Sequence, residues 1–157
     1  MLGAALQTGS GGGMISEVMF SSKTDQWSTP QWFFDSLNEE FRFTLDPCAD
    51  ETNHKCEKYF TKDDNGLLKG WDSERVFCNP PYGREITRWV EKCYTEVTAG
   101  SCDLAVMLIP ARTDTKWFHK YIYQKAEVRF LKGRLKFGDS KNAAPFPSMI
   151  VVFRKAA

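Results

Sequence analysis

One apolar run limits the possible folds more than any other stretch of this 157-residue chain. It covers residues 104–110, reads Leu-Ala-Val-Met-Leu-Ile-Pro, and contains no polar side chain. A strand that is apolar at consecutive positions is typical of the centre of a sheet that is covered on both faces. Such a sheet needs helices above and below it. The run therefore predicts a three-layer α/β fold.

The remaining chain alternates between helical and extended patterns, as that fold requires. Helices are predicted over about 30–40, over 85–98, and after the polar, cap-rich stretch 111–115. The segments with strand character are 41–45, 58–61, 75–78, 104–110 and 149–153. Residues 128–131 and 135–137 flank Lys132-Gly133 in the pattern of a tight hairpin. We expect a mostly parallel sheet with antiparallel strands at its C-terminal side.

A turn stiffened by two prolines follows the strand predicted over 75–78. It reads Asn79-Pro80-Pro81-Tyr82, and neither proline can donate a backbone hydrogen bond or vary its φ freely. The Asn79 amide oxygen and the Pro80 carbonyl can together accept both hydrogens of one NH2 group, while Tyr82 offers a flat face to a planar ring. Two acceptors on an amino group favour its methylation, because they stabilise the charge that develops on nitrogen. A plain turn between strand and loop is the alternative interpretation.

An acidic residue follows the first predicted strand, in the stretch Asp46-Pro47-Cys48-Ala49-Asp50. Open α/β sheets bind their ligands beyond the carboxyl ends of the strands, so Asp46 is placed to hold a cationic amine or a cofactor hydroxyl. Aspartate before proline is also a common turn former, and that structural role stays open.

Charge is distributed unevenly along the chain, although the net charge is only +1. Residues 1–110 contain 10 Lys/Arg and 17 Asp/Glu, a net charge of −7, whereas residues 111–157 contain 11 Lys/Arg and 3 Asp/Glu, a net charge of +8. This asymmetry predicts that the C-terminal third faces a polyanion. A basic but merely solvated surface is the alternative.

Composition excludes several classes of protein. No apolar stretch approaches the ~20 residues that span a bilayer, so we expect no membrane protein. The five cysteines are odd in number and include no C-x-x-C pair, which predicts reduced thiols in a cytoplasmic protein. No metal is expected, since His54 with Cys48 and Cys56 is better explained as an incidental grouping. Residues 1–13 end in Gly-Ser-Gly-Gly-Gly and are predicted to be a linker or tag remnant, with one domain over 14–157.

Several motifs in a fixed order resemble the phage-type Dam family of S-adenosylmethionine-dependent DNA N6-adenine methyltransferases. They lie at 25–30, 45–49, 64–67, 71, 79–82, 110–115 and 145–148, so that the resemblance covers about residues 25–155. It implies a Rossmann-like methyltransferase sheet and transfer of a methyl group from S-adenosylmethionine to the N6 amino group of adenine in double-stranded DNA. A phage or prophage gene would place the protein in the cytoplasm of a bacterial host.

The resemblance also implies roles for individual residues. The catalytic turn would be Asn79, Pro80, Pro81 and Tyr82, with the tyrosine stacking on a flipped base. The methionine end of the cofactor would lie against Thr29, Pro30, Asp46, Pro47, Cys48 and Ala49, and its adenine against Asp64 and Leu67. The DNA would be contacted by Arg112, Thr113, Lys116 and Lys141.

The sequence departs from the wider methyltransferase pattern in three ways. The first loop lacks the usual glycines, so the close backbone approach that they allow is not assured. The acid that would bind the cofactor ribose is open between Glu57, Asp63 and Asp64. No stretch is left for a separate target-recognition domain, so bases would be read by loops around 111–120 and 138–148.

Two other functions remain open from the sequence. The same turn suits the side-chain NH2 of a protein glutamine, although the positive charge disfavours that substrate. A catalytically silent DNA-binding module is the second, because the first loop is poor in glycine.

Overall fold

The computed structural model describes residues 27–138 and 140–156. Two compact units divide the chain, Ser28–Pro80 with Arg84–Ala157 and, separately, Met1–Trp27 with Pro81–Gly83. The larger unit contains all the helices and strands described below. The single domain over 14–157 stays a prediction, and the expected linker at 1–13 lies outside the described residues.

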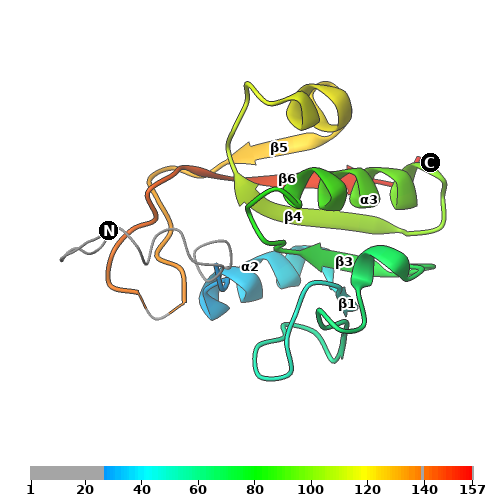
Figure 1. Cartoon of the computed structure of the whole chain (residues 1–157), viewed down its shortest axis with the longest axis horizontal. Coiled ribbons are helices and arrows are strands. Elements are labelled where there is room, and N and C mark those ends of the chain that lie inside the picture. The colour runs from blue at the N-terminus through cyan, green and yellow to red at the C-terminus, as the bar shows by residue number, and fades with distance from the viewer. Residues whose placement is uncertain (1–26, 139, 157) are drawn as a thin grey trace. The chain divides into compact units, whose positions relative to one another are not determined.

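Six strands form one sheet among the described residues, in the order β2-β1-β3-β4-β6-β5 (Figure 1). Their bounds are β1 Leu45–Asp46, β2 Lys58–Tyr59, β3 Arg75–Cys78, β4 Leu104–Pro110, β5 Glu127–Phe130 and β6 Ser148–Arg154. The first four are parallel to one another, whereas β6 is antiparallel to both β4 and β5. The predicted sheet, mostly parallel with antiparallel C-terminal strands, is confirmed.

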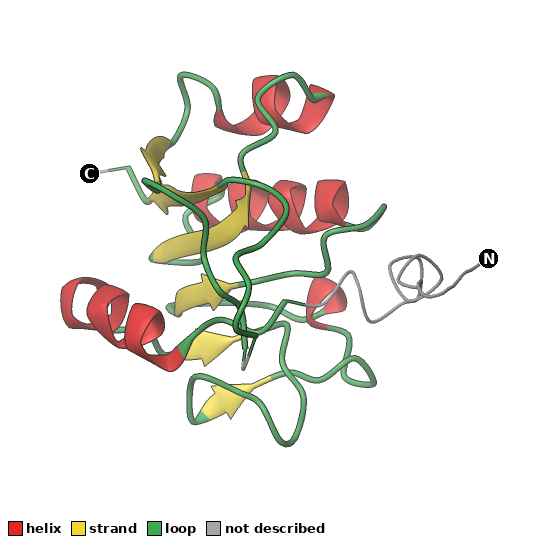
Figure 2. Ribbon diagram, turned by 90° about the vertical axis from the view of Figure 1, so that its left-hand side faces the viewer, coloured by secondary structure: helices red, strands yellow, loops and turns green. Residues whose placement is uncertain are grey.

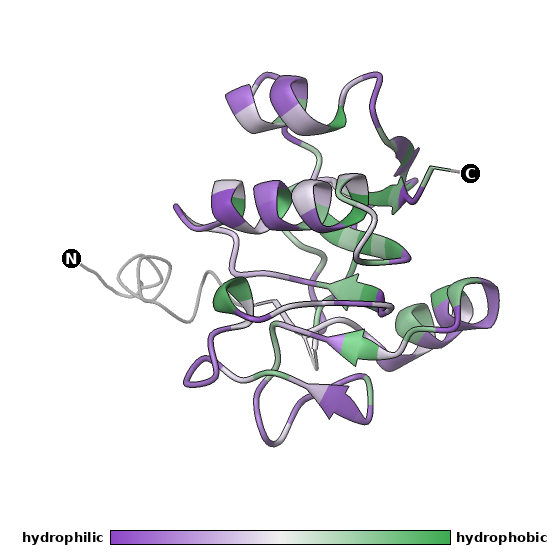
Figure 3. Ribbon diagram, turned by 90° about the vertical axis from the view of Figure 1, so that its right-hand side faces the viewer, coloured by the Kyte–Doolittle hydropathy of each residue, from purple (hydrophilic) through white to green (hydrophobic). Residues whose placement is uncertain are grey.

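The apolar run from Leu104 to Pro110 is central strand β4, and all seven of its residues are buried. It pairs with β3 on one side and along its whole length with β6 on the other, from Leu104 opposite Arg154 to Pro110 opposite Ser148. Apolar side chains can occupy every position because both faces of the strand are covered. Figure 3 shows these strands in the green of hydrophobic residues.

Helices cover both faces of the sheet. Helix α2 (Gln31–Phe41) places Phe34 against Phe77 of β3, with ring centroids 5.2 Å apart. The next residue, Cys78, points to the opposite face, where its thiol is hydrogen-bonded to that of Cys93 on α3 (Ile86–Thr98). Consecutive strand residues alternate between faces, so the two helices lie on opposite sides, as Figure 2 shows. None of the described helices has the length and apolar character that crossing a bilayer requires.

The motif at 64–71 supports the loop that follows β1. Asn65 has a left-handed backbone (φ 57°), and its side chain accepts a hydrogen bond from the Leu67 N–H at the start of the short 3-10 helix η2 (Gly66–Leu68). The fully buried Trp71 donates its indole N–H to the Gly66 carbonyl at 3.2 Å. A Cβ atom on Gly66 would lie 2.3 Å from the Pro47 carbonyl oxygen. Only glycine therefore permits this close packing of η2 on the first loop.

Two sequence-based expectations about local structure are wrong. The strand expected over 41–45 is limited to β1, because Phe41 is the last residue of α2 and Arg42 ends that helix in a left-handed conformation. No hairpin joins 128–131 to 135–137, because β5 takes β6 as its partner. The apolar residues at 135 and 137 are instead buried without forming a strand.

Gly66→Ala should destabilise the protein by about 1–3 kcal/mol, since the new methyl group must displace the backbone of the first loop. Urea unfolding would measure the change. Gly70→Ala is the matched control, because a Cβ there meets nothing closer than 3.9 Å and the change should stay within about 0.5 kcal/mol. Equal stabilities of the two variants would contradict this account of Gly66.

Candidate active site

The edge of the sheet at the carboxyl ends of β1 and β3 brings two predicted site residues close together. The strands are parallel neighbours, with Leu45 opposite Val76. The chain leaves β1 toward β2 on one side, and β3 lies on the other, so the crevice between them is the switch point of the topology. Ligands of open α/β sheets bind at such points. Asp46 ends β1, and Asn79 directly follows β3.

Asn79 is held by Thr29. The Asn79 Nδ2 donates a hydrogen bond of 3.0 Å to Thr29 Oγ1, which joins the end of β3 to the residue two before α2. Thr29 is buried (4% exposed), whereas Asn79 is half-buried. The bond fixes the rotation of the amide plane, and with it the direction of the acceptor Oδ1. The resemblance assigned Thr29 to the cofactor, and that role stays a prediction; in the structure the Thr29 hydroxyl accepts from the amide of Asn79.

The segment that carries Thr29 is itself fixed from two sides. Ser28 Oγ accepts a hydrogen bond of 2.8 Å from Asn53 Nδ2, in the loop between β1 and β2. The Ser28 carbonyl accepts another of 2.8 Å from the Gly138 N–H, in the chain between β5 and β6. Residues distant in sequence thus converge on the approach to α2. Pro30 continues it, since its carbonyl accepts the first two N–H bonds of the helix, from Phe33 and Phe34.

Asp46 is a buried carboxylate, 5% exposed. Its Oδ2 accepts from the backbone N–H of Lys55 at 2.9 Å and its Oδ1 from that of Cys48 at 3.4 Å. Burial raises the pKa of Asp46 above its ordinary value, an effect that these two N–H groups and the nearby positive charge of Lys55 only partly oppose. Within the described part of the chain no cationic side chain forms an ion pair with Asp46, since Lys55 Nζ donates to Gln31 instead.

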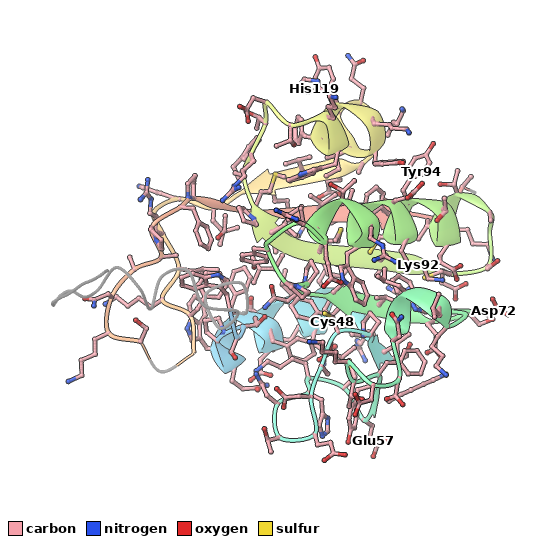
Figure 4. The ribbon with its side chains drawn as sticks, in the orientation of Figure 1. Cys48, Glu57, Asp72, Lys92, Tyr94 and His119 are labelled. Atoms are coloured by element: carbon pink, nitrogen blue, oxygen red, sulfur yellow. The ribbon has the colours of Figure 1, made fainter. Side chains whose placement is uncertain are left out.

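The loop after Asp46 runs beside the end of β2. Phe60 donates its N–H to the Asp46 carbonyl and accepts from the Ala49 N–H, each at 3.0 Å. Pro47 is buried beneath Gly66. Cys48, labelled in Figure 4, is half-buried, and desolvation together with the charge of Asp46 raises the pKa of its thiol. A thiol held in its neutral form is a poor nucleophile.

Asp64 and Leu67 flank Gly66, which packs against Pro47 of the same loop. The exposed Asp64 accepts hydrogen bonds from the N–H and hydroxyl of Thr61, which lower the pKa of its carboxyl group. Asp63 and Asp64 follow β2, whereas Glu57, labelled in Figure 4, precedes that strand. Of the three acids that the sequence left open as ribose partners, the two that follow β2 therefore lie beyond its carboxyl end.

The residues predicted to contact DNA are exposed. Arg112, Thr113 and Lys116 follow β4 in a turn where Thr115 Oγ1 bonds to the Arg112 carbonyl and accepts from the Phe118 N–H. Beyond this turn the chain forms one turn of π-helix, η3 (Phe118–Ile122). Lys141 lies apart from them in sequence, between β5 and β6. Ala111 donates to the Pro147 carbonyl at 2.9 Å, so the two connections meet at one edge of the sheet.

The structure thus places part of the predicted site at the carboxyl ends of β1 and β3. That part comprises Asn79 with Thr29, and Asp46–Ala49 with the 64–67 turn. Tyr82 is 7% exposed and belongs to the smaller unit, so its stacking role stays a prediction. Sequence reasoning missed Thr29 as the partner of Asn79, because fifty residues separate them and no periodic pattern links them. No group of three potential metal ligands occurs within residues 27–138 and 140–156.

This arrangement is that of a Rossmann-like methyltransferase. A solved structure of a proposed RNA methyltransferase from Pyrococcus horikoshii has the same fold, with a TM-score of 0.50 and 15% identity over 85% of this chain and 88% of that one. The chain belongs to the Dam family, DNA N-6-adenine-methyltransferases, whose family model matches residues 17–157. The predicted family is confirmed, and it favours neither of the alternative functions.

Two phage proteins illustrate the relationship. The DNA N-6-adenine-methyltransferase of Haemophilus phage HP1 is 28% identical over 144 residues, which cover 87% of this chain and 82% of the relative. That of Escherichia phage T1 is 31% identical over 113 residues, 71% of this chain but only 46% of the relative. The match to the T1 protein thus spans about half of that longer enzyme.

Asp46 should make stability depend on pH. Its raised pKa means that the folded state binds the proton more tightly than the unfolded chain, so its contribution is fully present below the unfolded pKa and is lost as pH rises through the folded pKa. Urea unfolding from pH 3.5 to 7 should therefore show wild type losing stability relative to Asp46→Asn as pH rises. The lost backbone acceptor adds only a constant difference. A pH-independent gap between the two proteins would contradict the raised pKa.

Proposed function

We propose that this chain transfers a methyl group from S-adenosylmethionine to the N6 amino group of adenine in double-stranded DNA. The observation that carries the proposal is the Asn79–Thr29 hydrogen bond beside the switch point of the sheet, in a chain of the Dam family. The bond holds the amide by its donor end, so that Oδ1 keeps one direction in space. A fixed acceptor is what an incoming amino group requires.

Asn79 and Pro80 act on the nitrogen that receives the methyl group. The Asn79 Oδ1 and the Pro80 carbonyl accept one hydrogen each from the N6 amino group, which draws the nitrogen lone pair out of conjugation with the ring. Charge then accumulates on nitrogen as the new bond forms, and both acceptors stabilise it. No side chain has to remove a proton before transfer. The N6–methyl bond forms as the bond from the methyl group to sulfur breaks, S-adenosylhomocysteine leaves, and the methylated nitrogen then releases one proton to solvent. Pro80 and Pro81 contribute by keeping the turn rigid, and Tyr82 would stack on the extruded base.

The chemistry around Asp46 fits the proposed cofactor. S-adenosylmethionine supplies a methyl group on a positively charged sulfur, and its methionine end carries an ammonium group. Asp46 is a buried anion whose hydrogen bonds come from backbone N–H groups, and a buried carboxylate is stabilised by a cation. Asp46 and the loop through Ala49 would hold the methionine end, while Asp64 and Leu67 would border the adenine. Thr29 accepts a hydrogen bond from the Asn79 amide, and the Pro30 carbonyl accepts the first N–H bonds of α2.

Incubation with S-adenosylmethionine labelled in its methyl group should place label in adenine of unmethylated duplex DNA. Nucleoside analysis of the product identifies the modified base, and a methylation-sensitive digest of treated plasmid reports the preferred sequence. Label in protein glutamine, or in no substrate while the cofactor binds, would overturn the proposal.

Asn79→Ala should lower kcat by at least about 10²–10³-fold, since one acceptor for the developing charge is lost. Calorimetric affinity for S-adenosylmethionine should stay within about twofold. Gln124→Ala, which removes an exposed amide between η3 and β5, is the matched control and should retain full activity. A fully active Asn79→Ala protein would exclude Asn79 from catalysis.

Thr29→Val should lower kcat about tenfold at an unchanged KM for DNA, because the amide of Asn79 then loses the contact that orients it. Thr29→Ser keeps the hydroxyl and should restore most of the activity. A purely structural role would instead lower the melting temperatures of both variants and leave their kcat values equal.

A further inference from the structure

Six of the eleven basic residues in the C-terminal third form two contrasting sets. The residues of the first set form ion pairs with acidic side chains of the same chain. Arg129 forms two bonds of 2.7 Å with the Glu40 carboxylate on α2, Arg154 bonds Glu127 at 2.7 Å, and Lys155 lies 3.7 Å from Asp103. Positive charge at these positions is therefore balanced by acidic neighbours.

The second set comprises Lys132, Arg134 and Lys136, which we call the basic strip. All three are exposed, and in the described part of the chain no carboxylate forms an ion pair with any of them. Three unbalanced charges within five residues repel one another. Such a cluster is costly unless it meets a negative surface.

The basic strip is held rigidly by buried neighbours. Leu135 and Phe137 are 6% and 4% exposed and alternate with Arg134 and Lys136, so the two cations project from the same side of an extended segment. The Leu135 carbonyl accepts from the Ala144 N–H at 2.7 Å, and the Phe137 ring packs on Phe146 with centroids 5.9 Å apart. The charges are thus displayed on a fixed backbone.

Hydrogen bonds also locate the strip at the candidate active-site edge. At one end, Leu131 donates to the Ser148 carbonyl, and Ser148 lies opposite Pro110, the last residue of β4. At the other end, Gly138 donates to Ser28, whose neighbour Thr29 holds Asn79. In Figure 1 the orange chain between β5 and β6 extends beyond the carboxyl end of β4.

We propose that the basic strip binds the phosphate backbone of the duplex and holds the target adenine's strand at the Asn79 edge. This inference rests on the proposed function and specifies which surface takes the substrate. Lysine and arginine contacts to phosphates position a protein on DNA without reading its sequence.

Phe130 adds an apolar contact beside the strip. It ends β5 opposite Met149, at the same edge of the sheet, and its ring is 64% exposed. An exposed ring next to three cations is able to pack on a deoxyribose or on an unstacked base. Its contribution is independent of salt, unlike that of the cations.

The test compares DNA binding by two triple variants that each remove three positive charges. Lys132→Gln/Arg134→Gln/Lys136→Gln removes the strip, whereas Lys69→Gln/Lys125→Gln/Lys155→Gln removes exposed charges elsewhere on the larger unit. Kd for a duplex oligonucleotide is measured by fluorescence anisotropy from 50 to 200 mM salt. Each lost phosphate contact lowers the slope of log K against log salt by about 0.9, so the strip variant should lose about 2–3 in slope and bind more than tenfold more weakly at 50 mM. The control variant should change the slope by less than about 1.

Equal slopes for the two variants would overturn the proposal that the basic strip binds the phosphate backbone. Binding is measured separately from methyl transfer. If the strip variant loses slope as expected but the wild-type protein labels no adenine, the proposed function alone is overturned. Phe130→Ala supplies a second measurement: affinity should fall several-fold with no change in slope. Far-UV circular dichroism and melting temperature of each variant establish that it is folded.

Discussion

The parallel pairing of β1 with β3 is the constraint on which the site depends. It places Asp46 and Asn79 at neighbouring strand ends although more than thirty residues separate them in sequence. The surrounding elements support this pairing. Strand β3 is enclosed between β1 and β4, and α2 and α3 cover the two faces of the sheet. The short helix η2 packs against the loop after β1. A change that disturbs this pairing would separate the Asp46 carboxyl group from the Asn79 amide.

Most of the sheet was predictable from the sequence because its signals are local. The apolar run of β4 and the helical spacing of Ile86, Trp89, Val90, Cys93 and Val97 are such signals, and both elements have the predicted bounds to within a residue. The false hairpin shows the limit of local patterns. Alternating apolar residues at 135 and 137 mark one buried face, but only the distant partner decides whether a segment joins the sheet, and β5 pairs with β6.

The candidate site was predictable in its residue types but not in its contacts. The Asn79 turn and the Asp46 loop were found from their place after strands, and the family confirms the class of chemistry that they suggested. The hydrogen bond from Asn79 to Thr29 joins two positions that share no pattern, and the motif around Gly66 and Trp71 serves packing. The net charge of +8 in the C-terminal third was also visible in the sequence. The sequence did not show that Arg129 is paired with a carboxylate within the fold whereas Arg134 is not.

The balanced cations have a consequence for association. Strand β5 is the last in the sheet, and an outermost strand offers its unused N–H and C=O groups to any extended chain. Arg129 and Glu127 project from this short strand and are linked to each other, to Glu40 and to Arg154. A second chain that paired with β5 would have to desolvate these ion pairs. The ion pairs therefore disfavour the stacking of further strands on this edge of the sheet.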